Sequence, residues 1–272
     1  MSKVNSYIME NGEEVVRLEI KTDPDDVRKH AEWCGLKPGI RVLDVGCGTG
    51  KVTSILHAMI QPGGEILGVD ASEERIDYAK KQYGRPSGID FRVLDFRAQL
   101  DDLGNFDLVW TRFVLEYFRK ESPAILRNLS ACLKPGGSLC LIDLDHNCLN
   151  HYELHPQMEE ILQKLMMRLE RDFNFDPYSG RKLYSYLYDL GYENIQMDLV
   201  AHHLIYGKIR DEDMFNWIKK VEVISKKTPD LFKSYPGGHD AFFSDFVKFF
   251  QNPRRFTYTP LILCKGIKPL TF

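Results

Sequence analysis

Two patterns of hydrophobic and polar positions take turns along the first half of the chain. Short β-branched apolar runs predict strands that are buried on both faces, and apolar residues at helical spacing predict helices between them. The expected strands lie at residues 40–45, 65–69, 91–94, 106–110 and 138–144, and the expected helices at residues 23–34, 49–59, 72–83 and 124–133. Because strands and helices alternate, we expect parallel strands with right-handed crossovers, hence an α/β, doubly wound sheet.

The pattern changes after residue 145. Helical periodicity with many aromatic residues now dominates, and only two further strands are expected. The expected helical segments lie at residues 150–174, 181–190 and 211–250, and the expected strands at residues 195–200 and 258–264. We expect most aromatic side chains of residues 202–252 to form the core of a helical cap, and the others to line an apolar pocket beneath a lid.

Composition and charge limit the partners that the chain can have. With 43% hydrophobic and 28% charged residues it has an ordinary globular composition, and its net charge of −3 gives no long-range attraction to nucleic acids. No signal peptide or apolar run of membrane-spanning length occurs. The six cysteines have no paired spacing, which predicts buried, reduced thiols. We therefore expect a cytoplasmic monomer or homodimer without nucleic-acid or membrane partners.

A glycine-rich turn, GCGTG, follows the expected strand at 40–45. An ATP-binding P-loop would require glycine at position 45 and a hydroxyl at position 52, but both positions are valine. The dinucleotide fingerprint would require a third glycine at the position of Lys51. The turn therefore favours a different nucleotide-like ligand.

Acidic residues near the ends of three expected strands indicate which ligand this is. Asp44 precedes the glycine turn and would repel a pyrophosphate, but it suits a cationic ligand such as S-adenosylmethionine. Asp70, at the end of the second strand, can accept hydrogen bonds from ribose hydroxyls. Asp95 can accept from an adenine amino group beside the ring of Phe96, although it could equally cap a loop.

The segments VLDVGCGTG, GVDAS, LDF, FDLVWTRFVLEYF and LKPGGSLCLID resemble, in order and spacing, the motifs of class I, Rossmann-like S-adenosylmethionine-dependent methyltransferases. Tyr7, Arg17-Leu18 and the segment Tyr178 to Leu183 more weakly resemble a small-molecule subgroup. The resemblance implies a mostly parallel seven-stranded sheet with an antiparallel last strand between strands five and six. The cofactor-binding residues that we expect from it are Tyr7, Arg17, Asp44, Gly46, Cys47, Gly48, Asp70, Ala71, Ile76, Asp95, Phe96, Thr111, Arg112 and Phe113.

With this resemblance, we expect a single methyltransferase domain over residues 1–272. It would comprise an N-terminal lid and helix at 1–37, a cofactor-binding core at 38–145, and a C-terminal half at 146–272 with helical insertions at 150–190 and 202–252. Tyr7 to Leu18 would form a second lid, from which Arg17 could pair with the cofactor's carboxylate.

Methyl transfer to oxygen or carbon can require a base, whereas transfer to a neutral amine need not. The candidate bases are Asp143, His146, His151, Glu116 and Tyr117, and each could instead have a structural role. His151 and His155 have the spacing of metal ligands, but without a third ligand we expect no metal site.

We expect the acceptor to be a small, partly apolar metabolite bound under the helical lid. A methyltransferase that acts on protein or RNA is the alternative. The NPPY-like signature expected of such an enzyme is absent, because residues 111–114, after the fourth expected strand, are Thr-Arg-Phe-Val. A non-catalytic S-adenosylmethionine-binding module is the third possibility.

Overall fold

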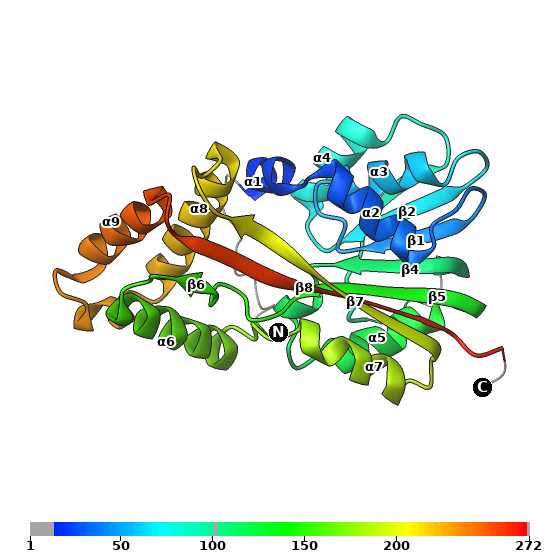
Figure 1. Cartoon of the computed structure of the whole chain (residues 1–272). Coiled ribbons are helices and arrows are strands. Elements are labelled where there is room, and N and C mark those ends of the chain that lie inside the picture. Colours follow the sequence, from blue (N-terminus) through cyan, green and yellow to red (C-terminus); the bar gives the residue numbers. More distant parts are fainter. Residues whose placement is uncertain (1–13, 99, 101–102, 271–272) are drawn as a thin grey trace.

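The computed structural model describes residues 14–98, 100 and 103–270. A central sheet runs through the molecule in the strand order β3-β2-β1-β4-β5-β8-β6, and β7 pairs with β8 (Figure 1). The strands are β1 (Arg41–Val45), β2 (Glu65–Asp70), β3 (Ile89–Val93), β4 (Phe106–Arg112), β5 (Leu133–Leu144), β6 (His151–Tyr152), β7 (Glu193–Ile205) and β8 (Phe256–Ile267). The first five strands are mutually parallel, which confirms the expected doubly wound core.

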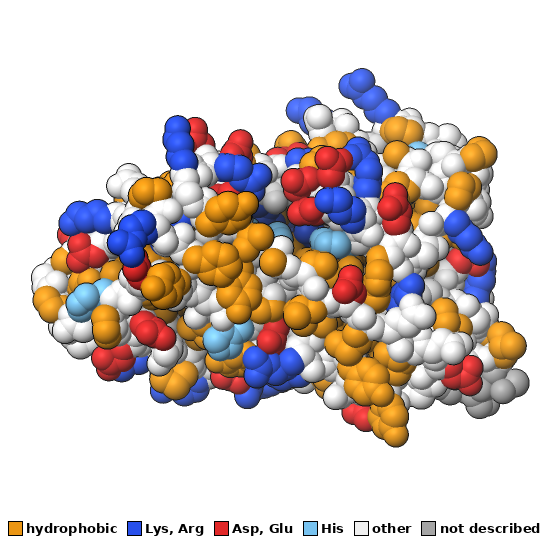
Figure 2. Space-filling view, in the orientation of Figure 1, with side chains coloured by type: hydrophobic (Ala, Val, Ile, Leu, Met, Phe, Trp, Pro, Cys, Tyr) orange, Lys and Arg blue, Asp and Glu red, His pale blue; other side chains and the backbone are white. Residues whose placement is uncertain are grey.

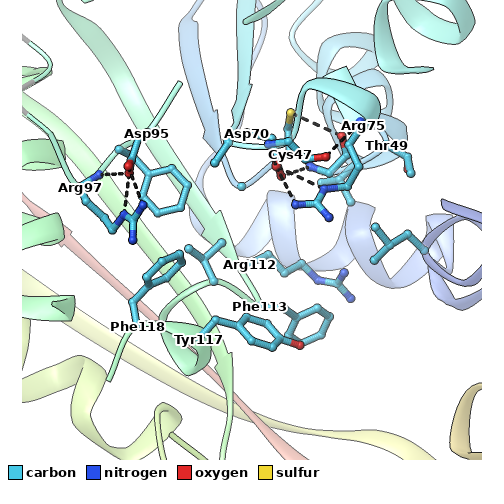
Figure 3. Close-up of a pocket in the computed structure, with 18 of the residues that line it drawn as sticks. Cys47, Thr49, Asp70, Arg75, Asp95, Arg97, Arg112, Phe113, Tyr117 and Phe118 are labelled. Carbon is cyan, nitrogen blue, oxygen red and sulfur yellow. Dashed lines mark hydrogen bonds and ion pairs between the residues drawn. The ribbon is translucent and has the colours of Figure 1, made fainter. Parts of the chain in front are cut away.

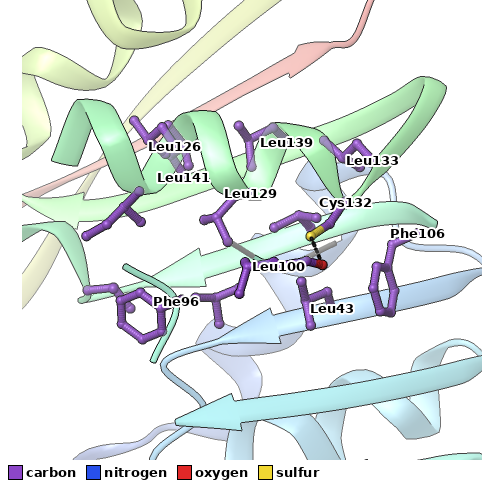
Figure 4. Close-up of a cluster of buried hydrophobic side chains, with 14 of the residues drawn as sticks. Leu43, Phe96, Leu100, Phe106, Leu126, Leu129, Cys132, Leu133, Leu139 and Leu141 are labelled. Atoms are coloured by element: carbon purple, nitrogen blue, oxygen red, sulfur yellow. Dashed lines mark hydrogen bonds between the residues drawn. The ribbon is translucent and has the colours of Figure 1, made fainter. Parts of the chain in front are cut away.

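Helices cover both faces of the parallel sheet (Figure 1). Apolar side chains of α2, α3 and α4 pack on one face, and those of α5 and α7 pack on the other. Figure 4 shows the second of these layers, in which Leu126 and Leu129 of α5 lie over the strands. The helices are α1 (Glu14–Lys21), α2 (Pro24–Cys34), α3 (Lys51–Met59), α4 (Glu73–Tyr83), α5 (Ser122–Ala131), α6 (Pro156–Asp172), α7 (Leu183–Asp189), α8 (Asp211–Lys227) and α9 (Gly238–Gln251), with short 3-10 helices η2 (Leu115–Tyr117), η3 (Gly180–Lys182) and η4 (Pro229–Ser234).

Local signals in the sequence explain where the helices of the core begin and end. The Asp23 side chain accepts a hydrogen bond from the backbone N–H of Asp25 at 2.9 Å and thereby caps α2. Gly35 ends this helix in the left-handed conformation, with φ of 89°. Ser72 caps α4 in the same way as Asp23 caps α2, and Lys51 is the first residue of α3.

The last strand lies antiparallel between β5 and β7, as expected. Leu263 of β8 is paired with Ile142 of β5 on one side and with Asp198 of β7 on the other. This insertion joins the C-terminal half of the chain to the parallel core. The structure adds the two-residue strand β6, so that the sheet has eight strands rather than seven.

The helix expected at residues 150–174 begins later than its periodicity indicated. His151 does not lie in the helix. It belongs to β6 and is paired with Thr257 of β8. His155 then caps α6 by accepting from the backbone N–H of Gln157, and Pro156 is the first helical residue. The expectation was wrong by one and a half turns because the partner of β6 is more than a hundred residues away in the chain.

The aromatic residues of the C-terminal half form a separate hydrophobic core between α6, α8, α9 and η4. We call these four elements the cap. Trp217, Phe242, Phe246 and Phe250 are almost completely buried in it, which confirms the expected cap core. Among the described residues, no helix combines the length and apolarity that crossing a membrane requires. None of the six cysteines, which all lie within the described residues, forms a disulfide, and all but Cys148 are buried.

Hydrophobic side chains gather on the face of the molecule that β7 and β8 form (Figure 2). Met197, Leu199 and Leu204 of β7 and Phe256 and Tyr258 of β8 are exposed there. Since β7 pairs only with β8 among the described strands, its other edge is open to solvent.

Replacing Phe246 by alanine tests whether the cap is a packed core. Phe246 is fully buried and lies 4.9 Å from the ring of Phe250, so its loss leaves a cavity. We expect Phe246→Ala to lower the free energy of unfolding by about 3–5 kcal/mol in urea titrations. Tyr188→Ala, at a residue that is 66% exposed, is the control and should change it by less than about 0.5 kcal/mol. Equal effects of the two substitutions would contradict a packed cap.

Candidate functional site

A cavity of about 390 Å³ opens at the carboxyl ends of β1, β2 and β4. It begins at α1, passes over the glycine turn after β1, and reaches the loop after β3. The residues that line it include Leu18, Lys21, Gly46, Cys47, Gly48, Asp70, Ala71, Arg75, Asp95, Phe96, Arg97, Arg112, Phe113, Tyr117, Phe118 and Glu121. The carboxyl edge of a parallel sheet is where α/β proteins commonly bind ligands.

Two glycines of the turn have a positive φ that other residues rarely adopt, and at Gly46 a side chain would also collide with the wall of the cavity. Gly46 has φ of 71°, and a Cβ atom on it would lie 2.5 Å from Cγ2 of Val114. Gly48 has φ of 55°, and a Cβ atom there would contact Leu18 of α1 at 3.4 Å. Both glycines therefore let the backbone itself form the wall, as close approach to a ligand requires.

Asp70 lines the cavity beside Cys47 and Arg75, with its carboxylate already engaged (Figure 3). Its oxygens accept from the backbone N–H groups of Gly48 at 3.0 Å and Ser72 at 2.9 Å. Nη2 of Arg75 also donates to Oδ1 at 3.0 Å. Since only one of these donors reaches Oδ2, that oxygen can accept a further hydrogen bond. Sequence reasoning missed Arg75, although its place one turn into a capped helix was available as a signal.

The far end of the cavity carries a second carboxylate–arginine pair (Figure 3). Arg97 donates from Nη2 to Asp95 at 2.7 Å, and this hydrogen bond holds the pKa of Asp95 below its usual range. The backbone N–H of Arg97 also bonds to Asp95. Phe96 is buried beside them and packs edge-on against Phe118 at 5.3 Å. Asp95 therefore serves as a loop cap and also lines the cavity.

Arg112 and Phe113, at the end of β4, form the opposite wall (Figure 3). Phe113 has φ of 60°, a left-handed conformation that is uncommon for a bulky residue. The guanidinium of Arg112 lies 4.2 Å from the centroid of the Phe113 ring, and the ammonium of Lys21 lies 5.1 Å from it. The ring of His202 approaches the same phenyl ring at 5.2 Å.

Most of the expected cofactor-binding residues meet in this cavity. Those that line it are Gly46, Cys47, Gly48, Asp70, Ala71, Asp95, Phe96, Arg112 and Phe113. Ile76 is instead fully buried in the hydrophobic layer under α4, and Thr111 is buried within β4. Tyr7 lies outside the described residues.

Asp44 lies just behind the glycine turn and does not line the cavity. It is only 2% exposed, and its Oδ2 accepts a hydrogen bond from the Thr53 hydroxyl at 2.6 Å. Burial raises the pKa of Asp44 to about 7, with the Thr53 hydrogen bond opposing the rise. Near neutral pH this carboxyl is therefore close to half-ionised, so that a nearby cation would favour its ionised form.

Arg17 does not enter the cavity, contrary to the expectation that it meets the cofactor's carboxylate. Its Nη2 is paired with Glu14 at 2.7 Å, and its Nη1 donates to Oδ1 of Asn216 at 3.0 Å. All three residues are buried, and the contact joins α1 to α8. Leu18 and Lys21 of the same helix line the cavity instead.

Among the candidate bases, Tyr117 lines the cavity. The two carboxylate candidates, Asp143 and Glu116, are not part of the lining. Asp143 accepts from the backbone N–H groups of Glu116 and Leu144 and from the Ser179 hydroxyl. Oε2 of Glu116 accepts from Nδ2 of Asn147 at 3.0 Å. Burial raises the pKa of both carboxyls.

The histidine candidates also lie outside the lining. His151 packs against Trp217 in the cap, and its ring nitrogens lie 2.9 Å from the Thr257 hydroxyl and 3.2 Å from the Cys148 carbonyl. Burial lowers its pKa to about 4. His146 lies 2.7 Å from Asn150. These contacts give both histidines structural roles.

Comparison with known proteins identifies the segment that supplies most of the cavity lining. Residues 42–137 match a family model described as a methyltransferase domain. Juvenile hormone acid O-methyltransferase of Bombyx mori is 38% identical over 115 residues, 40% of each chain. Phosphoethanolamine N-methyltransferase 1 of Arabidopsis thaliana is 28% identical over 120 residues, 44% of this chain and 24% of that one. This chain thus covers less than half the length of either relative.

The fold of the chain is also similar to that of solved methyltransferases. Phosphoethanolamine N-methyltransferase 2 of Haemonchus contortus, solved with phosphomonomethylethanolamine and S-adenosylhomocysteine, superimposes with a TM-score of 0.59. The superposition covers 94% of this chain and 57% of that chain at 15% identity. At this identity the likeness concerns the fold alone.

The raised pKa of Asp44 predicts how stability depends on pH. Because its pKa is about 7 in the folded chain and near 4 when unfolded, the unfolded state loses its proton first as pH rises. The free energy of unfolding of the wild type, relative to that of Asp44→Asn, should therefore fall by about 2–3 kcal/mol between pH 5 and pH 8. Urea titrations of both proteins at each pH measure it, and a constant difference would refute the assignment.

Proposed function

We propose that the chain is a class I S-adenosylmethionine-dependent methyltransferase that transfers a methyl group to a small, partly apolar molecule; its residues 42–137 match the methyltransferase-domain family model. One observation carries the proposal: the cavity at the carboxyl edge of the sheet is bounded by residues of this same segment and is closed on one side by α1. The finer assignments below belong to this proposal.

The residues of the cavity fit this cofactor in their chemistry. The glycine turn gives backbone contact, Asp70 retains an oxygen that can accept from a ribose hydroxyl, and Asp95 and Phe96 offer an acceptor and a ring to adenine. Asp44, half-ionised near neutral pH behind the turn, complements the cofactor's positive charge. In this assignment Arg112 does not contact the cofactor's amine, since two cations would repel each other.

The cap and α1 support a small acceptor rather than a macromolecule. Leu18 and Lys21 of α1 lie over the cavity, and α1 is tied to α8 of the cap through Arg17 and Asn216. Phe173, next to α6, lines the cavity together with Tyr117 and Phe118. An acceptor would thus lie between apolar walls that exclude water. We propose that α1 acts as the lid.

The relatives support the same class of acceptor. Their names assign methyl transfer to juvenile hormone acid in one case and to phosphoethanolamine in the other, and both compounds are small molecules. Because these names differ in both substrate and methylated atom, they support a small acceptor without defining it.

When bound, S-adenosylmethionine supplies a methyl group on a positively charged sulfur. The residues of the chain would hold the reacting partners in line and keep water out, and alignment of this kind contributes a large part of the rate of such transfers. Phe113, Tyr117 and Phe118 present aromatic groups to the cavity, and aromatic faces attract cations by about 0.5–2 kcal/mol.

A labelled-methyl assay tests the proposal directly. The purified chain is incubated with methyl-labelled S-adenosylmethionine and, in separate reactions, with a fractionated small-molecule extract, total protein or total RNA. We expect label in the small-molecule fraction only. Label in protein or RNA would favour a macromolecular acceptor, and label in no fraction despite cofactor binding would favour a non-catalytic module.

Replacing Asp70 tests the cofactor site. Asp70→Ala removes the expected ribose acceptor and the partner of Gly48, so we expect the dissociation constant for S-adenosylmethionine to rise about 10-fold to 100-fold in calorimetric titrations. Asp77→Ala, on the exposed side of α4, is the matched control and should bind as the wild type does. Unchanged binding by Asp70→Ala would exclude this cofactor site.

A further inference from the structure

Two basic side chains in the cavity have no acidic partner among the residues that the structure describes. Nε of Arg112 is buried without a hydrogen-bond partner, and the guanidinium lies 4.2 Å from the centroid of the Phe113 ring. Burial lowers the pKa of Arg112 to about 10, so that it stays charged at neutral pH. The ammonium of Lys21 lies over the same ring.

Two of the other enclosed arginines have carboxylate partners, whereas Nε and Nη2 of the buried Arg255 have no hydrogen-bond partner. Arg17 is paired with Glu14 at 2.7 Å, and Arg75 with Asp70 at 3.0 Å. Enclosing a cation without a counter-ion is unfavourable, and the cost is reduced when an anion binds beside it. Arg112 and Lys21 therefore form a site with an unmet preference for an anion.

Charged groups of both signs act on the two side chains: Asp26, Asp44 and Asp23 act on Arg112, and Arg17, Glu14 and Lys220 act on Lys21. Lys220 of α8 repels Lys21 and contributes to the lowering of its pKa, of which burial is the main cause. Of the acidic groups that act on Lys21, Glu14 is paired with Arg17, and Glu116 has a pKa raised by burial and an Oε2 bonded to Asn147. No described carboxylate lies within ion-pair distance of Lys21 or Arg112.

Apart from the hydroxyl of Tyr117, the cavity offers little to remove a proton from an acceptor. Its described lining contains no histidine, and its carboxylates are already engaged. Asp70 is paired with Arg75, Asp95 with Arg97, and Glu121 accepts from the Asn174 side chain. An alcohol would need a base here, and a protonated amine would be repelled by Arg112 and Lys21. A carboxylate has neither difficulty.

We propose that the acceptor is a carboxylic acid, bound as its carboxylate by Arg112 and Lys21, and that the product is its methyl ester. This rests on the proposed function. A carboxylate oxygen would form the new C–O bond to the methyl carbon as the C–S bond breaks. The electron pair of the C–S bond stays on sulfur, which becomes a neutral thioether, and no proton is released. The negative charge of the acceptor and the positive charge of the sulfonium are both lost.

The competing occupant of this site is the carboxylate of the cofactor itself. Both groups have the same chemistry, so affinity for each must be measured separately. If Arg112 and Lys21 serve the acceptor, their loss raises the Michaelis constant of the acid and leaves cofactor binding nearly unchanged. If they serve the cofactor, its dissociation constant rises as well.

The first experiment compares matched acceptors. Octanoic, dodecanoic, benzoic and cinnamic acids are each assayed beside the alcohol and the amine of the same carbon skeleton, with methyl-labelled S-adenosylmethionine. We expect at least one acid to be methylated at least about 10-fold faster than its alcohol and amine, giving a product whose label mild alkali releases as methanol. Faster methylation of an alcohol or amine, or of no acid at all, overturns the proposal.

The second experiment uses variants with the best acid of the panel. Arg112→Gln and Lys21→Met should each raise its Michaelis constant about 10-fold to 100-fold, and Arg112→Lys should recover part of the loss. Arg127→Gln and Lys120→Met remove the same charges from exposed positions and should behave as the wild type. Calorimetry should give a dissociation constant for S-adenosylmethionine within about 3-fold of wild type for all of them, which also shows that the variants are folded.

The outcomes separate this inference from the function on which it rests. Absence of cofactor binding, or of transfer to any small molecule of an extract, would remove the proposed function. Transfer to a small molecule in an alkali-stable product would leave the function standing and overturn the carboxylic acid. A loss of cofactor affinity in Arg112→Gln equal to the loss for the acid would assign the two cations to the cofactor instead.

Discussion

The parallel pairing of β1 with β2 and β4 is the constraint on which the site depends. Asp44 is paired with Gly68 on one side and with Trp110 on the other, so that all three strands end at the same edge of the sheet. The segments that follow these strands must then meet above that edge. Residues as distant in sequence as Gly46, Asp70 and Arg112 line one cavity for this reason.

The two sides of the cavity differ in charge. Asp70 and Asp95 each have an arginine from their own loop or helix, so this side is nearly neutral and positions donors and acceptors without a strong field. Arg112, at the end of β4, has no such partner among the described residues, and Lys21 lies beside it. The unbalanced charge lies next to α1, on the side away from Asp95, and an anion bound there would correct it.

Local signals were sufficient to predict the core of the fold. Asp23, Gly35 and Ser72 act within a few residues of themselves, and glycines with positive φ mark the turn after β1 whatever surrounds it. The sequence could not predict contacts between distant segments. The pairing of His151 with Thr257 displaced the start of α6, and the contact of Arg17 with Asn216 joins residues 199 positions apart. The same limit explains the site: the motif positions that line the cavity were expected, whereas the part of Arg75 in the cavity and the bonds of Arg17 to Glu14 and Asn216 were not.

Helix α1 connects the parts of the molecule that two ligands would occupy. Leu18 lies against the glycine turn, Lys21 lies beside Arg112, and Arg17 is bonded to the cap through Asn216. These residues span just over one turn of helix, so one cannot move far without the others. We propose that α1 acts as the lid of the cavity, and its opening would break the buried contact between Arg17 and Asn216. Access to both proposed binding sites is therefore coupled to the contact between α1 and the cap, although neither of these two residues lines the cavity.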